Sequence, residues 1–300
     1  MADRELRTVA SGFTFLEGPR WHEGQLWFSD FFTHTVNAIA DDGHVEVMAE
    51  VPARPSGLGW LPDGRLLVVS MLDRKVMRQE DEHRPELVEH ADLAALIGGP
   101  AKDMVVDARG RAYVGNFGFD FDHGESYRPT TVVSVDPDGA AAVAADGLAF
   151  PNGMVITPDG QTLIVNELMN NRITAFDIAD DGTLSGRRAW ADFGDLGDET
   201  DIGRRLGAAT IVPDGLTMDV EGAVWVADAA HNRAVRIAEG GEILDQIETP
   251  EPVFAVTLGG VDGCRLYLCV APDSNAVERA ATRLGRMLAT KVDAAHAGRP

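Results

Sequence analysis

The phrase that decides the fold of this chain reads Gly222-Ala-Val-Trp-Val-Ala-Asp228, a glycine followed by a short apolar run and a polar residue. Five further copies read Gly24-Gln-Leu-Trp-Phe-Ser-Asp30, Gly64-Arg-Leu-Leu-Val-Val-Ser70, Gly110-Arg-Ala-Tyr-Val-Gly-Asn116, Gly160-Gln-Thr-Leu-Ile-Val-Asn166 and Gly263-Cys-Arg-Leu-Tyr-Leu-Cys269. Successive glycines lie between 40 and 62 residues apart. Short strands that begin at glycine turns and recur at this period are typical of propeller blades. The sequence therefore predicts an all-β fold, a six-bladed β-propeller with four-stranded antiparallel blades.

Partner strands follow the repeated phrase. Segments that alternate or are rich in β-branched residues occur a few positions after five of the copies, at 35–39, 75–78, 131–135, 172–176 and 233–237. This spacing is what antiparallel hairpins require. No Pro/Ser-rich linker divides the chain, so we expect residues 1–300 to form a single propeller domain. Helices are expected only at 91–96 and 275–287, and residues 193–210 are expected to form a long surface loop near one mouth of the propeller.

Composition limits the classes of partner. A net charge of −22 opposes binding to nucleic acid and to anionic membranes, although it is also explained by solubility alone. The expected partner is a small-molecule substrate, and the oligomeric state stays open. No apolar run approaches the ~18 residues of a transmembrane helix. The opening residues lack an apolar signal core, so a cytoplasmic location is expected. Cys264 and Cys269 are five apart in one predicted strand and should point to opposite faces as buried free thiols.

One position of the repeat carries the candidate chemistry. Counting back eight residues from each glycine, or seven in the shorter first repeat, gives Glu17, Ser56, Lys102, Asn152, Asp214 and Ala255. The innermost strands of a propeller line its central channel, so one repeat position maps onto a ring around the axis. Oxygen atoms of Glu17, Asn152 and Asp214 are the ligand type that Ca²⁺ or Mg²⁺ prefers. The sequence thus predicts an axial site for a divalent cation.

A plainer interpretation exists for two of these residues. Asn-Gly and Asp-Gly are common turn sequences, and the Pro-Asp-Gly runs at Asp63 and Asp159 are turns of the repeat. By themselves, Asn152 and Asp214 would favour turns. Three oxygen-bearing residues at one phase of a sixfold repeat favour the cation site instead.

Several motifs resemble one family. They include Glu17-Gly-Pro-Arg-Trp21, Gly57-Leu-Gly-Trp-Leu-Pro-Asp-Gly-Arg-Leu66, Asn116-Phe-Gly-Phe-Asp120, Pro151-Asn-Gly-Met154, Pro213-Asp-Gly-Leu-Thr-Met-Asp219 and Leu258-Gly-Gly260. Across nearly the whole chain, in order and spacing, they resemble the senescence marker protein / gluconolactonase / luciferin-regenerating enzyme family. The resemblance implies lactone hydrolysis with one catalytic divalent metal, usually calcium or zinc. For this chain we expect Ca²⁺ first, with Zn²⁺, Mg²⁺ or Mn²⁺ as further candidates. It places Glu17, Asn152 and Asp214 on the family's metal-ligand positions.

Lys102 departs from that pattern, because the family usually carries Asn where this chain has Lys102-Asp103. The ammonium has three possible fates. It can pair with Asp103 or Asp214 and leave a three-ligand metal site, become a neutral amine of lowered pKa, or replace the metal altogether. In the first case we expect Asp214 to act as ligand and general base and Lys102 to stabilise the tetrahedral oxyanion.

Weaker candidates surround this ring. Asn116, Asp120 and Ser56 are expected to contact substrate together with Lys102, and the 117–127 loop is expected to form part of the pocket wall. His123 in that loop is expected to be a solvated histidine. Two alternative functions stay open. One is a metal-free propeller enzyme that uses Lys102 for condensation, cyclisation or isomerisation, in which case no cofactor is needed; the other is a non-catalytic binding propeller.

Overall fold

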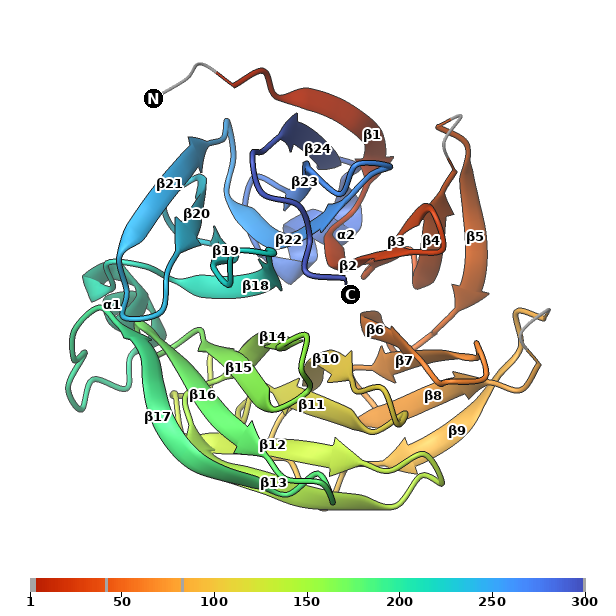
Figure 1. The fold of residues 1–300 in the computed structure, drawn as a ribbon, viewed down its shortest axis with the longest axis horizontal. Coiled ribbons are helices and arrows are strands. Elements are labelled where there is room, and N and C mark those ends of the chain that lie inside the picture. The colour runs from red at the N-terminus through yellow and green to blue at the C-terminus, as the bar shows by residue number, and fades with distance from the viewer. Residues whose placement is uncertain (1–3, 41–42, 82–83, 299–300) are drawn as a thin grey trace.

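Six four-stranded antiparallel sheets surround a central axis in the computed structural model, which describes residues 4–40, 43–81 and 84–298 (Figure 1). From the axis outward, the first three blades are β2 (Leu16–His22), β3 (Gln25–Asp30), β4 (Thr35–Ile39) and β5 (Val45–Glu50); β6 (Pro55–Trp60), β7 (Leu66–Ser70), β8 (Lys75–Gln79) and β9 (Leu87–Asp92); and β10 (Ala101–Val106), β11 (Ala112–Asn116), β12 (Thr130–Val135) and β13 (Ala141–Leu148). The next two are β14 (Pro151–Ile156), β15 (Thr162–Glu167), β16 (Arg172–Ile178) and β17 (Leu184–Asp192), then β18 (Pro213–Met218), β19 (Val224–Asp228), β20 (Arg233–Ile237) and β21 (Ile243–Glu248). The predicted six-bladed propeller is confirmed.

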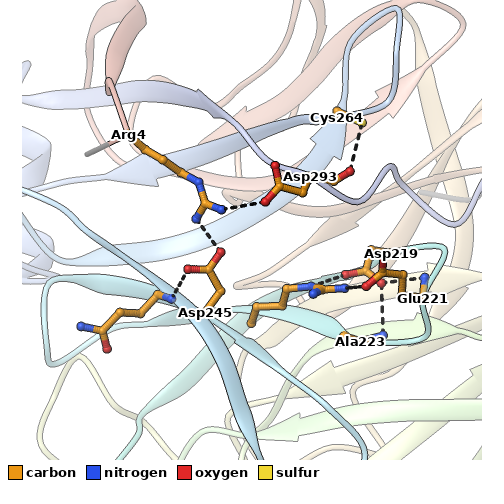
Figure 2. Close-up of polar contacts among 9 residues, drawn as sticks. Arg4, Asp219, Glu221, Ala223, Asp245, Cys264 and Asp293 are labelled. Carbon is orange, nitrogen blue, oxygen red and sulfur yellow. Dashed lines mark hydrogen bonds and ion pairs between the residues drawn. The ribbon is translucent and has the colours of Figure 1, made fainter. Parts of the chain in front are cut away.

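The sixth blade joins the two ends of the chain. Its inner strands are β22 (Val253–Gly259), β23 (Arg265–Val270) and β24 (Gly285–Lys291), and its outermost strand is the N-terminal β1 (Arg7–Phe13), which pairs antiparallel with β24. Figure 2 shows a second tie at this seam: Arg4 donates to Asp245 Oδ2 at 2.5 Å and to Asp293 Oδ2 at 3.4 Å. Asp245 belongs to β21 of the neighbouring blade, so the N-terminal segment helps to close the ring.

The apolar core lies between neighbouring blades. The apolar run of each repeated phrase forms the second strand of a blade, and its side chains pack against the next sheet. Trp225 of β19, for example, is 1% exposed and packs with Leu258 and Leu266 of the sixth blade. Burial between blades therefore fixes how closely the inner strands approach one another at the axis.

Strand predictions were accurate, whereas helix predictions needed correction. All five predicted partner strands are present as β4, β8, β12, β16 and β20. The helix expected at 91–96 is wrong, because residues 91 and 92 end β9 and the following residues form turns. The helix expected at 275–287 is shorter, α2 (Ala276–Ala281), since the chain must return as β24 to complete the sixth blade.

The 193–210 segment contains a short helix, α1 (Ile202–Ala208), which begins after the N-cap Asp201. Both cysteines are free thiols, but only Cys269 is buried, because Cys264 precedes β23 and is partly exposed. Neither helix of the described chain has the length and apolar character needed to cross a membrane.

Candidate functional site

The ring predicted by counting along the repeat lies where the inner strands begin. Glu17, Ser56, Lys102, Asn152 and Asp214 are each the second residue of an inner strand, and Ala255 is the third residue of β22. In every blade the pairing register of the inner strand shifts at this point. Such irregularities re-aim side chains and are common beside active sites.

The glycines that follow ring residues serve close packing and not turns. A Cβ on Gly57 would lie 2.4 Å from the Met104 nitrogen, and one on Gly153 would lie 2.6 Å from the Asp214 carbonyl oxygen. Both contacts cross to the next inner strand. The Asn-Gly and Asp-Gly pairs therefore lie in strands, because only glycine permits this approach between blades. The turn interpretation of Asn152 and Asp214 is wrong.

Four charged or amide side chains of the ring meet in the interior. Lys102 Nζ forms an ion pair with Glu17 Oε1, and the Asn152 amide nitrogen donates to Asp214 Oδ1 at 2.5 Å. All four side chains are at most 4% exposed. Pairing of Lys102 with Asp103 or Asp214 was one of the expected outcomes. The ion-pair partner of Lys102 in the structure is Glu17 instead.

Asp103 is held elsewhere. Its Oδ1 accepts from Arg20 Nη2 at 2.8 Å, and Arg20 also donates to the Met104 carbonyl oxygen at 2.7 Å. Arg20 and Asp103 are both buried and form an ion pair beside the ring. Lys102 pairs instead with Glu17 of another blade, and its ammonium also lies 4.8 Å from the centre of the Phe31 ring.

Burial and mutual charge determine the protonation of the ring. Burial alone would lower the pKa of Lys102, but the carboxylates of Glu17 and Asp214 outweigh it and hold that pKa above its ordinary value. The option of a neutral Lys102 amine with lowered pKa is therefore not supported. Burial raises the pKa of Asp214 well above its usual range, and the nearby Glu17 carboxylate raises it further. Burial also raises the pKa of Glu17, against the opposing effect of Lys102.

Two oxygen atoms of the ring have no hydrogen-bond partner within the described structure. They are Asn152 Oδ1 and Ser56 Oγ, and both are buried. Buried polar atoms are nearly always satisfied, so an unpartnered oxygen calls for an explanation such as a bound ion, water or ligand. Here the amide of Asn152 lies beside the Asp214 carboxylate, to which its nitrogen donates.

The donor chemistry fits a divalent cation of the calcium type. Glu17 and Asp214 supply carboxylate oxygens and Asn152 supplies the unpartnered amide oxygen, which together form an all-oxygen set suited to a hard cation. Within the described residues, no three His, Cys, Asp or Glu side chains form a metal-binding group on their own. A cation at this place would thus depend on Asn152 as well as on the carboxylates.

A cavity of about 130 Å³ opens above these residues. Glu17, Lys102, Asn152 and Asp214 line it, and we call these four side chains the floor. The remaining lining residues, which we call the wall, include seven phenylalanines, among them Phe15, Phe31, Phe117, Phe150 and Phe254. The cavity therefore joins a charged floor to an aromatic wall.

Three predicted substrate contacts do not line this cavity. Asn116 is fully buried and bonds to the carbonyl oxygen of Thr131 and the hydroxyl of Thr130. Asp120 lies on the exposed loop and accepts from His123, which is solvated as expected. Ser56 belongs to the ring but is absent from the cavity lining. From the 117–127 loop, the wall receives Phe117, Phe121 and Asp122 in place of Asp120.

Three buried carboxylates behind the site were missed by sequence reasoning. Asp30, Glu167 and Asp228 are fully buried and accept from the backbone nitrogens of Phe15, Ala149 and Val212, respectively. Each bond anchors the segment that leads into an inner strand just before its ring residue. A signal was present, since each carboxylate ends the second strand of its blade. These residues position the ring and wall.

The fold and the axial ring define a six-bladed propeller with one charged central site. Residues 15–272 match the SMP-30/Gluconolactonase/LRE-like region, and the chain belongs to this family. Pentonolactonase XacC of Haloferax volcanii is 25% identical over 272 residues, covering 88% of this chain and 84% of that protein. The 6-deoxy-6-sulfogluconolactonase of Pseudomonas putida is 26% identical over 166 residues, covering 54% of this chain and 53% of that one.

Solved structures agree on the architecture. The calcium-binding protein regucalcin from Agrobacterium tumefaciens superimposes with a TM-score of 0.78 at 18% identity, covering 99% of this chain and 97% of that one. A gluconolactonase from Xanthomonas campestris gives a TM-score of 0.73 at 23% identity, covering 97% and 91% of the two chains. At these identities the likeness supports the fold alone.

Proposed function

We propose that this protein hydrolyses lactones at the floor of the axial cavity, with a divalent cation, in first place Ca²⁺, held by Glu17, Asn152 and Asp214. The observation that carries the proposal is the burial of two carboxylates, an ammonium and an unpartnered amide oxygen in one cavity. Burying such groups is costly unless they serve a ligand or a reaction. Membership of a family whose relatives include named lactonases supports this reaction class.

The cation, when bound, would supply Lewis-acid polarisation of the lactone carbonyl and a lowered pKa for a coordinated water. The protein's own part begins with Asp214. Its carboxylate lies on the ring beside Asn152, where it can take a proton from the attacking water as the water oxygen bonds to the carbonyl carbon. The ring C–O bond then breaks, and the proton passes to the departing alkoxide. The product is a hydroxy acid, so atoms and charge balance.

Lys102 and Asn152 would orient and stabilise. The Lys102 ammonium lines the cavity and carries a full charge that can oppose the negative charge developing on the carbonyl oxygen. Asn152 fixes Asp214 through its amide nitrogen and leaves its oxygen free for the cation. Preorganised groups in a water-poor site act most strongly on such charge.

One observation favours a second candidate. Because Lys102 pairs with Glu17, the ammonium already neutralises one of the carboxylates that a cation would use. In a metal-free enzyme the same pair would act directly as acid and electrostatic stabiliser in a condensation, cyclisation or isomerisation. The two candidates differ in whether activity needs a metal.

Elemental analysis combined with a turnover assay tests the proposal. The protein is purified without chelator or nickel affinity, its metal content is measured by mass spectrometry, and lactone hydrolysis is followed by proton release. We expect about one Ca²⁺ per chain and hydrolysis that chelation abolishes and added calcium restores. Lactone hydrolysis that survives chelation in metal-free protein would refute the role of the cation and favour direct action of the Lys102–Glu17 pair. A metal-loaded protein that hydrolyses no lactone would refute the proposed reaction.

A further inference from the structure

The wall of the cavity has a chemistry of its own. Seven phenylalanines line it, together with Met71, Leu72 and Leu168. They come from several blades and converge on one opening. Because pockets match the polarity of the ligand surface that they bury, this wall bears on the kind of substrate that reaches the floor.

The aromatic residues hold one another in place. Phe117 and Phe150 lie 4.2 Å apart between ring centres, and Phe15 and Phe254 lie 4.7 Å apart. Phe150 and Phe254 are only 3% and 6% exposed. Rings packed this closely form a preformed apolar surface, since rotating one would clash with the next.

Polar side chains are few above the floor. Among the described residues that line the cavity, the wall offers Arg54, Asp122 and Ser274. Arg54 and Asp122 are already engaged, with Arg54 Nη1 donating to Asp122 Oδ2 at 2.7 Å. The Arg54 guanidinium also lies 4.7 Å from the centre of the Phe32 ring. The wall thus has little free capacity to bond with substrate hydroxyl groups.

We infer that the substrate is a lactone with an apolar alkyl or aryl substituent, and not a polyhydroxylated sugar lactone; this deepens, and rests on, the proposed function. The ester group meets the charged floor, and the substituent packs against the phenylalanines toward the mouth. The cavity volume of about 130 Å³ accommodates a single ring. A cavity of similar volume is known to hold benzene.

A sugar lactone would meet the wrong surface. Each hydroxyl group that enters the aromatic wall leaves its hydrogen bonds to water and finds few side-chain partners in return. An alkyl chain gains from the same burial. The named sugar lactonases among the relatives therefore share the reaction class proposed here but, on this inference, not the substrate class.

A matched lactone series tests the inference by activity. The three substrates share a six-membered lactone ring: δ-valerolactone without a substituent, δ-decalactone with a pentyl chain, and glucono-1,5-lactone with hydroxyl groups. We expect kcat/KM for δ-decalactone to exceed that for gluconolactone by about 100-fold or more, after correction for spontaneous hydrolysis. Faster turnover of gluconolactone would overturn the inference while leaving lactone hydrolysis intact.

Binding of lactams separates failure of the inference from failure of the proposed function. The probes are 6-pentylpiperidin-2-one and glucono-1,5-lactam, which resist hydrolysis, measured by calorimetry. Tighter binding of the pentyl lactam supports the apolar pocket even when no lactone is turned over, in which case only the proposed reaction falls. Tighter binding of gluconolactam, or binding of neither lactam, overturns the inference.

Two leucines provide a matched pair of variants. Leu72 lines the cavity and is 48% exposed, whereas Leu284 is 49% exposed and lies outside the cavity lining. Leu72→Ser should weaken binding of the pentyl lactam roughly fivefold and leave gluconolactam unchanged, because only the alkyl chain uses this surface. Leu284→Ser should change neither. Equal effects of the two substitutions would overturn the assigned role of the wall.

Discussion

The floor of the axial cavity is charged and built from residues within the inner strands, whereas the wall above it is mainly apolar and built mostly from residues just beyond the strand ends. Floor residues such as Asp214 are fixed by strand pairing and by glycines that allow the blades to approach. Wall residues such as Phe117 and Leu72 belong to connections, which tolerate change. On the proposed function, the contrast separates two tasks: the floor serves the reaction, and the wall selects what reaches it.

This division predicts two kinds of mutational effect. A change in the floor should affect every substrate alike, because the ester group is common to all of them. A change in the wall should affect only the substrates that use the apolar surface.

Asp214→Asn should have the largest effect. The substitution keeps the size of the side chain but removes the charge proposed to hold a cation and to accept a proton, so kcat/KM should fall by about 10³ for all lactones. Steady-state kinetics on the matched lactone series measures it. A loss confined to one substrate would show that Asp214 belongs to substrate selection and not to the reaction.

The chain contains a matched control for this variant. Asp159 occurs in the same tripeptide, Pro-Asp-Gly, but lies in an exposed turn where its side chain accepts from the Gln161 nitrogen at 3.0 Å. Asp159→Asn keeps an acceptor oxygen and lies outside the axial site. Its activity should equal that of the unmodified protein.

Lys102→Met should reveal whether a cation shares the floor. When the Lys102 ammonium is removed, Glu17 becomes a buried carboxylate with no counter-charge. Breaking such a buried pair costs about 3–5 kcal/mol of folding free energy. Calcium should restore most of that loss, because the cation supplies the missing charge. Urea unfolding of metal-stripped protein, with and without calcium, measures both quantities.

The comparison for Lys102 is an exposed pair. Lys75 Nζ lies 2.7 Å from Glu89 Oε2 at the surface, so Lys75→Met should change the unfolding free energy little, with or without calcium. A Lys102→Met protein that calcium fails to stabilise would argue against a cation on Glu17 and for the metal-free candidate.

Much of the floor could be predicted from the sequence because it is periodic. One strand phrase recurs six times, so counting from its glycine reached every ring residue, Glu17 and Asp214 included. The pairing of Lys102 could not be predicted this way. The pairing depends on the distance between side chains of different blades and on the bond between Arg20 and Asp103. Neither can be derived from the spacing of residues along the sequence.

The wall residues also recur with the repeat, at positions other than the ring position. Two residues before a ring position stand Phe15, Arg54, Pro100, Phe150 and Val212, and all five line the cavity. Seven residues after the phrase glycine stand Phe31, Met71, Phe117 and Ala229, which line it as well. Most of these positions are apolar and resemble ordinary core residues in sequence. Only the geometry shows that they face a cavity.

Arg54 allows the smallest and sharpest comparison, because it is the one cation of the wall among the described residues that line the cavity. If the wall acts through apolar area, Arg54→Met should hold kcat/KM for δ-decalactone within about twofold, since methionine keeps a chain that can pack on Phe32. Arg54→Ala removes that chain and should lower the same constant about threefold. Both variants should leave δ-valerolactone unchanged. Equal losses in the two variants would mean that the charge of Arg54, paired with Asp122, governs entry to the floor, and the wall would then select by electrostatics as well as by apolar contact.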